Sequence, residues 1–210
     1  PFVLREATQA RAFRHTLCLR QSEARIREGL QIAAALLGDP DQDGAHRKQR
    51  EAERLVREGM AWTLFDEMDN PALKHELFRL HANGDYHALY AVMENPEERW
   101  LDRVGLNPDG NLYKATASRE ERNGTYEKKT NQHEDYSDLR TFLNELHDTP
   151  RNQLTDFFIE KTVPDTIIDY QAGQVLINNR DYPHNYLYLS HATETDRWIP
   201  TGWDLDLAYG

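Results

Sequence analysis

The chain has 210 residues, enough for one well-packed domain, and it is strongly polar, with 39% hydrophobic residues, 29% charged residues and a net charge of -11. This acidic balance argues against a nucleic-acid-binding surface, which needs a basic stripe to neutralise phosphates. No apolar run approaches the roughly 18 residues of a membrane-spanning helix. The single cysteine, Cys18, excludes an internal disulfide and a cysteine-rich zinc site.

The first part of the chain has a helical composition. Residues 4–36 combine helix-favouring side chains with spaced aliphatic ones, which predicts one or two amphipathic helices without a catalytic role. A further helix is predicted for residues 46–66, where apolar side chains gather towards the C-terminal half. In this helix Glu58 lies one turn before Trp62, so we expect a carboxylate and an aromatic ring on the same face, although a solvated helix charge is the alternative for Glu58.

A β-hairpin is predicted next. Apolar and polar residues alternate on both sides of the Asn-Gly pair at 83–84, which is the strongest short-range indicator of a hairpin turn. Two antiparallel strands are therefore expected at about 75–81 and 86–93. Asn95 is expected to cap a short helix that ends at Gly105.

The second half is predicted to be mainly helical. One short strand is expected at 111–115, and the almost wholly polar residues 116–136 are interpreted as a mobile loop or insertion. Helices follow at 137–148, at 151–161 and after Pro164. The last of these helices is expected to bury one apolar set, which consists of Ile167, Ile168, Tyr170, Val175, Leu176 and Ile177.

Two acidic groups flank two strand-like runs near the C-terminal end. Asp181 and Asn185 precede the first run, and the second run leads to Asp204 and Asp206, whose spacing puts both side chains on one face if the strand continues. A hairpin would then gather three carboxylates and one amide at one end. Such oxygen ligands suit Mg²⁺ or Mn²⁺, and an uncoordinated aspartate can deprotonate an attacking hydroxyl in phosphoryl transfer. A solvated acidic turn fits the spacing about equally well.

Longer stretches indicate a family. The chain contains, in this order, NGDYHALYAVMEN, ERWLDRVGLNPDGNLYKA, YEKKTN, NNRDYPHNYLYL and WIPTGWDLDLAYG. Together they resemble the CotH kinase family, the atypical protein kinases similar to spore coat protein H. The resemblance covers about 54–210 and leaves 1–53 as a helical N-terminal segment of unknown role. It implies an α+β, protein-kinase-like fold that is incomplete and truncated at both ends: a small-lobe hairpin, a helical large lobe with a catalytic β-hairpin, and extra N-terminal helices.

The same resemblance implies roles for the acidic residues. Asp181 would be the catalytic base, Asn185 and Asp204 would be metal ligands, and Asp206 is a second candidate ligand. The implied activity is transfer of the ATP γ-phosphoryl group to Ser or Thr of a coat or surface protein, with Mg²⁺ or Mn²⁺ as the metal ion. The implied location is the cell surface, the secreted space or the spore coat.

Two upstream carboxylates are expected near the nucleotide. Glu58 would be the partner of a phosphate-binding lysine, and Glu94 would lie near the adenine edge, although an exposed strand-end charge is the alternative for Glu94. Residues 1–53 depart from the family pattern, because they show neither a glycine-containing phosphate loop nor a strand-borne lysine. This departure motivates a second hypothesis, a non-catalytic coat or surface module on a kinase-like scaffold. A D-x-D glycosyltransferase is a third hypothesis, which explains Asp204 and Asp206 alone.

Overall fold

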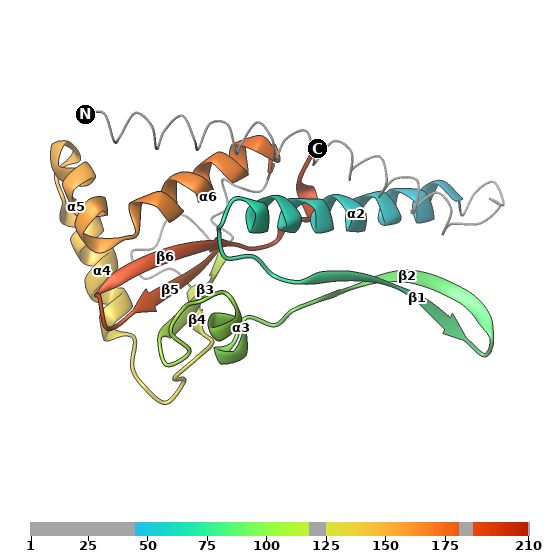
Figure 1. The fold of residues 1–210 in the computed structure, drawn as a ribbon, viewed down its shortest axis with the longest axis horizontal. Coiled ribbons are helices and arrows are strands. Elements are labelled where there is room, and N and C mark those ends of the chain that lie inside the picture. Colours follow the sequence, from blue (N-terminus) through green and yellow to red (C-terminus); the bar gives the residue numbers. More distant parts are fainter. Residues whose placement is uncertain (1–44, 118–124, 181–186, 210) are drawn as a thin grey trace.

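The computed structural model describes residues 45–117, 125–180 and 187–209. These residues form helices and two antiparallel sheets, one with two strands and one with four (Figure 1). The predicted α+β class is therefore confirmed. Among the helices within these ranges, none combines the length and the apolar character that crossing a membrane requires.

The predicted helix and hairpin are both present. Helix α2 spans Ala45–Glu67, and it is followed by strands β1 (His75–Ala82) and β2 (Asp85–Met93), which pair antiparallel. Asn83 and Gly84 both have positive φ angles, 55° and 93°, as the two central residues of a type I′ hairpin turn require. The boundary predicted between residues 53 and 54 stays a prediction; it falls within α2.

The hairpin has one covered face and one bare face. Leu77 of β1 and Leu89 of β2 pack against Ala52 and Val56 of α2. Figure 1 shows α2 running alongside the hairpin on this side. The bare face carries four exposed apolar side chains, which are Phe78, Leu80, Tyr90 and Val92.

The short helix after the hairpin is confirmed, but its predicted cap is wrong. Helix α3 spans Glu98–Arg103, and Glu97 holds the N-cap position without a side-chain cap bond. The Asn95 amide instead donates a hydrogen bond to the Glu97 carboxylate. The predicted stop is supported by Gly105, whose φ of 75° suits a residue just beyond a helix end. Trp100 is fully buried and fixes α3 to the core.

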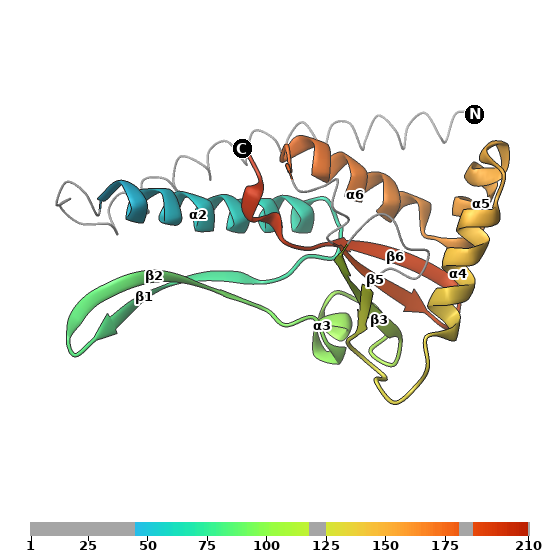
Figure 2. The ribbon, with the colours of Figure 1, turned by 180° about the vertical axis from the view of Figure 1, so that it is seen from behind.

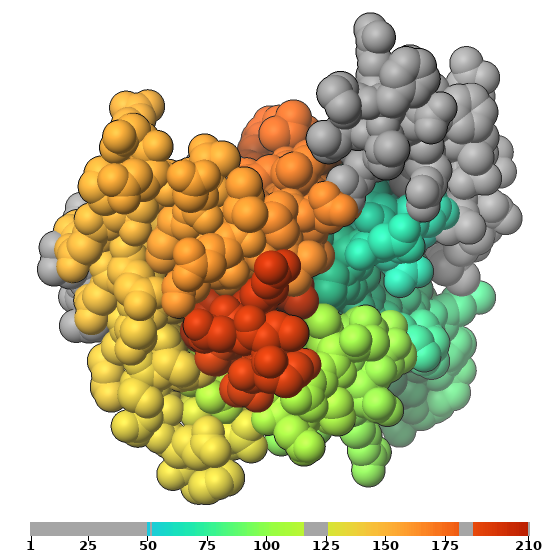
Figure 3. All heavy atoms as spheres, turned by 60° about the vertical axis from the view of Figure 1, so that its left-hand side comes forward, coloured from blue at the N-terminus to red at the C-terminus, as the bar shows by residue number. Residues whose placement is uncertain are grey.

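The larger sheet has the strand order β4-β3-β5-β6. Its strands are β3 (Asn111–Ala117), β4 (Thr125–Lys128), β5 (Leu187–Ala192) and β6 (Arg197–Gly202). Two of them, β5 and β6, form the predicted C-terminal hairpin. Figure 3 shows this C-terminal part, in red, at the surface between the helical residues in yellow and orange and the earlier residues in green.

The interpretation of residues 116–136 as a loop is wrong where β3 continues to Ala117 and where β4 forms, and residues 118–124 lie outside the described ranges. Polar composition hid strand β4, because its pairing with β3 supplies backbone hydrogen bonds that composition does not reveal. Tyr126 packs against the apolar cluster under the sheet, and Lys128 is buried with its ammonium group donating to the Asp135 carbonyl.

Helices α4 and α5 cover one end of the sheet. Helix α4 spans Ser137–Asp148 as predicted, and the next predicted helix begins as a 3-10 turn at Arg151–Gln153 before α5 at Leu154–Lys161. The ring of Phe142 from α4 stacks on Trp198 of β6 with centroids 4.8 Å apart. This aromatic contact fixes α4 against the sheet.

Helix α6 spans Pro164–Leu176 and has one exposed side. The prediction that it buries its whole apolar set is wrong for Ile168 and Val175, which are 56% and 76% exposed. The packed side lies close to α2, since a Cβ atom at Gly173 would come within 2.5 Å of the Phe65 ring. The buried or half-buried members of the set are Ile167, Tyr170, Leu176 and Ile177.

The main core joins the parts that surround the predicted site. It draws large side chains from α2, α3, β5 and the residues after β6: Trp62, Phe65, Trp100, Tyr188 and Leu205. Seen from behind in Figure 2, the C-terminal segment runs from the sheet to α2. The C-terminal turn is therefore held directly on the helix that carries Glu58.

Candidate active site

The register of the C-terminal hairpin fixes where its two ends meet. Leu187, the first residue of β5, pairs with Gly202, the last residue of β6. The chain therefore enters β5 and leaves β6 at the same end of the sheet. Asp181 and Asn185 lie outside the described residues, so their predicted roles stay predictions.

The turn that follows β6 is built differently from the prediction. We expected Asp204 and Asp206 to share one face of a continuing strand, but the strand ends at Gly202 and a 3-10 turn follows at Leu205–Leu207. Asp204 has a left-handed backbone with φ of 56°, which aspartate adopts more readily than most residues. Leu205 is fully buried and anchors the turn in the core, so a carboxylate lies on each side of an apolar anchor.

Helix α2 adds a third carboxylate to this turn. Glu58 is only 7% exposed. Its pKa is raised above the usual value, first by burial and then by the negative charges of Asp206 and Asp204. The structure therefore brings three of the predicted site residues into one electrostatic group, although they come from distant parts of the chain.

Sequence reasoning missed one member of this group. Arg54, one helical turn before Glu58 on α2, forms an ion pair with Asp206 at 2.6 Å. The Arg54 side chain is 60% exposed and that of Asp206 is 15% exposed. The spacing of Arg54 and Glu58 on one helix face was the available indication. Even with this partner, burial and the two aspartates keep the pKa of Glu58 raised.

The donor chemistry of this group fits a hard divalent cation. Mg²⁺ and Mn²⁺ prefer carboxylate oxygens and are usually bound through one or two of them together with phosphates. Such a cation would offset the negative charges of Asp206 and Asp204, which together with burial raise the pKa of Glu58. Within 45–117, 125–180 and 187–209, no three His, Cys, Asp or Glu side chains are arranged to hold a metal ion by themselves. The predicted ligand Asn185 is outside these ranges.

A cavity of about 390 Å³ lies between α2 and β2. Its walls are Leu55 and Glu58 from the helix and residues 88–91 and Met93 from the strand. This volume lies in the range of small-molecule sites. The cavity therefore extends from Glu58 to the end of the strand that leads to Glu94.

A comparison with models of protein families gives one match. The model described as CotH kinase protein matches residues 42–210, which is more than half of the chain. The chain belongs to the CotH kinase family. The resemblance seen in the sequence stretches is thereby confirmed, and kinase-like function is supported at the level of the family. No curated protein matches the chain.

In this CotH kinase family member, the carboxylate of Glu94 accepts hydrogen bonds from other residues of the same chain. Arg103 of α3 donates from Nε to Glu94 Oε1 at 2.8 Å, and the Lys74 backbone N–H donates to Oε2 at 3.1 Å. Although partial burial opposes it, these hydrogen bonds lower the pKa of Glu94. Glu94 therefore links α3 to the hairpin through its side chain, and its predicted place near adenine stays a prediction.

A second polar centre of this CotH kinase family member lies at the other end of β5. Asp138, at the start of α4, accepts hydrogen bonds from His191 Nδ1 at 2.8 Å, from Asn111 Nδ2 at 2.9 Å and from the Tyr113 hydroxyl. The His191 ring stacks on Trp198, with centroids 4.3 Å apart and planes 2° apart. Burial alone would raise the pKa of Asp138. The hydrogen bonds from His191, Tyr113 and Asn111 together have the larger effect and lower the pKa of this carboxyl.

Proposed function

We propose that this protein is a metal-dependent atypical kinase that transfers the γ-phosphoryl group of ATP to Ser or Thr hydroxyls of a coat or surface protein. The observation that carries the proposal is the convergence of Glu58 with Asp204 and Asp206 at the end of β6. Membership of the CotH kinase family supports the same class of chemistry.

The proposed fold is an incomplete kinase fold with a site between two parts. Helix α2 and the β1–β2 hairpin belong to the small lobe, and the larger sheet with α4 to α6 belongs to the large lobe. ATP occupies the cavity between α2 and β2 and extends towards the acidic turn, with Glu58 and Glu94 as the nucleotide-binding residues. This position brings the phosphates near the carboxylates that follow β6.

Each acidic residue has one proposed task. Asp181 orients the acceptor hydroxyl and takes its proton, while Asn185, Asp204 and Asp206 are the residues that would hold Mg²⁺ or Mn²⁺. The metal ion, when bound, supplies positive charge to the phosphoryl oxygens. Most of the remaining catalysis in phosphoryl transfer is positioning, which the buried anchor Leu205 provides for the turn.

Transfer of radiolabelled phosphate from ATP tests the proposal. The full-length protein is incubated with Mn²⁺ and with casein as a generic acceptor, and its own phosphorylation is followed as well. Asp181→Ala and Asp204→Ala should each lower the rate at least about a hundredfold, because each removes a group that acts on the reacting atoms. Asp204→Asn, whose side chain also tolerates the left-handed backbone at this position, should show the same loss of rate without a fall in melting temperature.

A matched control lies in the same hairpin. Asp196 is an exposed carboxylate in the turn between β5 and β6, at the end remote from Asp204, and Asp196→Asn should retain the wild-type rate. If Asp204→Ala transfers phosphate as fast as Asp196→Asn, the assignment is wrong.

The second candidate is a non-catalytic coat or surface module on the same scaffold. It is favoured by the surroundings of Glu58, which has no lysine ion pair within the part of the chain that the structure describes. Calorimetry with ATP in the presence and absence of Mn²⁺ separates the two candidates. A pure interaction module shows no metal-dependent binding of the nucleotide, whereas the kinase does.

A further inference from the structure

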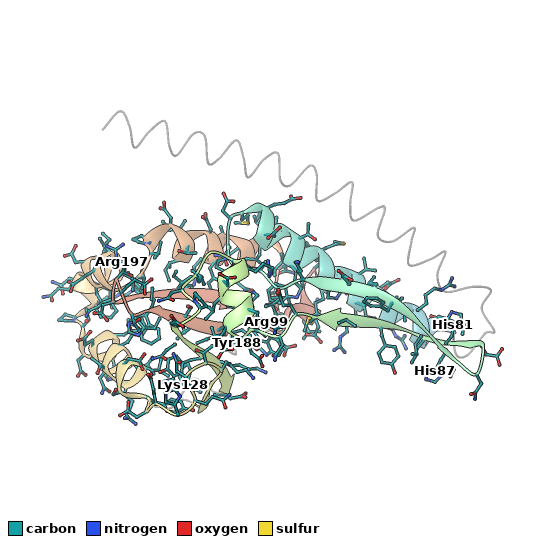
Figure 4. The ribbon with its side chains drawn as sticks, turned by 60° about the horizontal axis from the view of Figure 1, so that its bottom comes forward. His81, His87, Arg99, Lys128, Tyr188 and Arg197 are labelled. Carbon is teal, nitrogen blue, oxygen red and sulfur yellow. The ribbon has the colours of Figure 1, made fainter. Side chains whose placement is uncertain are left out.

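A row of side chains crosses the larger sheet towards the acidic turn. Lys114 of β3 pairs with Tyr188 of β5, and Tyr188 pairs with Thr201 of β6. Directly paired residues of antiparallel strands project to the same face of a sheet, so these three side chains share one face. Tyr188 lies in the body of the molecule, whereas His81 and His87 mark the distant hairpin tip (Figure 4).

Trp203, which precedes Asp204 in the chain, packs its ring against this row. Its ring meets the ring of Tyr188 edge to face, with centroids 5.4 Å apart and planes 84° apart. Tyr188 is buried, so it gives Trp203 a fixed support. The residue after Trp203 is Asp204, a proposed metal ligand, so the backbone carries this ring directly into the acidic turn.

The ammonium group of Lys114 rests on this ring. Its Nζ atom lies 3.9 Å from the centroid of Trp203, well within the distance of about 6 Å at which a cation and an aromatic face attract each other. Glu127 stands opposite Lys114 in the sheet, but its carboxylate pairs with Lys129 at 3.1 Å. Within the described ranges no carboxylate forms an ion pair with Lys114, unlike Lys128, Lys129 and Lys161.

A cation that rests on a ring and pairs with no carboxylate of the described residues is available to an anionic ligand. We propose that Lys114 binds phosphoryl oxygens of the nucleotide, with Trp203 holding the ammonium group beside the acidic turn until the ligand arrives. The inference rests on the proposed function. A triphosphate that approaches three carboxylates needs positive charge beyond that of a metal ion, and a lysine ammonium is a compact point charge suited to phosphate.

The test compares two lysine variants of the full-length protein. Lys114→Met removes the proposed contact, and Lys161→Met removes an equal charge at the opposite end of the β5–β6 hairpin, where Lys161 pairs with Glu145 and Asp196. The affinity for ATP with Mn²⁺ is measured by calorimetry. The affinity for adenosine is measured by ligand-detected NMR, which is suited to weak binding.

Lys114→Met should weaken ATP binding by at least about tenfold and leave adenosine binding unchanged, because only the charge-assisted phosphate contact is lost. Lys161→Met should bind both ligands as the wild type does, and Lys114→Arg should recover part of the ATP affinity.

Three outcomes would overturn the inference, and they have different meanings. Unchanged ATP affinity in Lys114→Met would show that Lys114 does not contact phosphate. An equal loss for ATP and adenosine would show that Lys114 only supports the shape of the site. If the wild-type protein binds no ATP with Mn²⁺ at all, the proposed function itself fails, and the inference fails with it.

Discussion

Two groups of carboxylates in this molecule have opposite surroundings. Asp138 is surrounded by donors, and hydrogen bonds from His191, Tyr113 and Asn111 lower its pKa in spite of burial. Glu58 is buried among like charges, so burial, Asp206 and Asp204 raise its pKa. Both carboxylates are held by the fold, but only the first is stabilised in its charged form.

The difference fits a structural role for Asp138 and the proposed ligand-binding role for Glu58. The hydrogen bonds of Asp138 join α4 to strands β3 and β5, so this carboxylate supports the fold. A raised pKa means that the charged form of Glu58 is held at a cost, which a nearby bound cation would offset. Groups that are unfavourable in the free protein and favourable in the complex are common at functional sites.

The largest expected effect on stability comes from Asp138. Asp138→Asn removes the charged acceptor of the hydrogen bonds from His191, Tyr113 and Asn111. It should lower the free energy of unfolding by about 3 kcal/mol. Because the pKa of Asp138 is lowered from 3.8 in the folded state, its contribution is fully present above that value and is lost as the pH falls below it. Urea unfolding at neutral and at strongly acidic pH measures this. If the difference in the free energy of unfolding between the wild type and Asp138→Asn stays constant with pH, the structural role of Asp138 is contradicted.

Glu58 should show the opposite sign and a smaller effect. Glu58→Gln removes a charge that the folded protein holds at a cost, and it should raise the free energy of unfolding at pH 8 by about 1 kcal/mol. Because the folded-state pKa is raised above 4.5, the advantage of the variant should disappear as the pH falls below 4.5, where Glu58 is protonated in both states. Thermal unfolding of the wild type and of Glu58→Gln from pH 8 to below pH 4.5 measures this difference in stability. A variant that is less stable than the wild type at pH 8 would show that the charge of Glu58 is satisfied.

Asp196 should have the smallest effect. It also contacts His191, at 3.2 Å, but its side chain is 69% exposed and water screens its interactions. Asp196→Asn should change the free energy of unfolding by less than about 0.5 kcal/mol. Chemical denaturation at neutral pH measures the change. A loss comparable to that of Asp138→Asn would mean that the two carboxylates act on His191 as one unit.

Periodicity and turn chemistry predicted most of the fold. The hairpin around Asn83 and Gly84 and the helix that carries Glu58 were both predicted because local sequence determines them. Strand β4 was missed because its residues are polar, and its pairing with β3 is a long-range effect. Val175 was predicted to be buried but is exposed. In a helix with apolar residues on several sides, the sequence does not show which side the rest of the protein covers.

The candidate site was predicted in part. Glu58, Asp204 and Asp206 were all expected near one ligand, and the structure brings them together. Their geometry was not predictable, because the left-handed backbone of Asp204 and the burial of Leu205 depend on packing against α2. Arg54 was missed for the same reason, since its partner lies far along the chain.

The central claim is the proposal that Asp204 and Asp206 of the turn after β6 help to hold a divalent cation, and the response of the melting temperature to Mn²⁺ tests it most directly. Saturating Mn²⁺ should raise the melting temperature of the wild-type protein, because a ligand that binds only the folded state stabilises it. Asp204→Asn should lose most of this shift, while Asp196→Asn should retain it. An equal shift in wild type and Asp204→Asn, or no shift in the wild type, would contradict the claim.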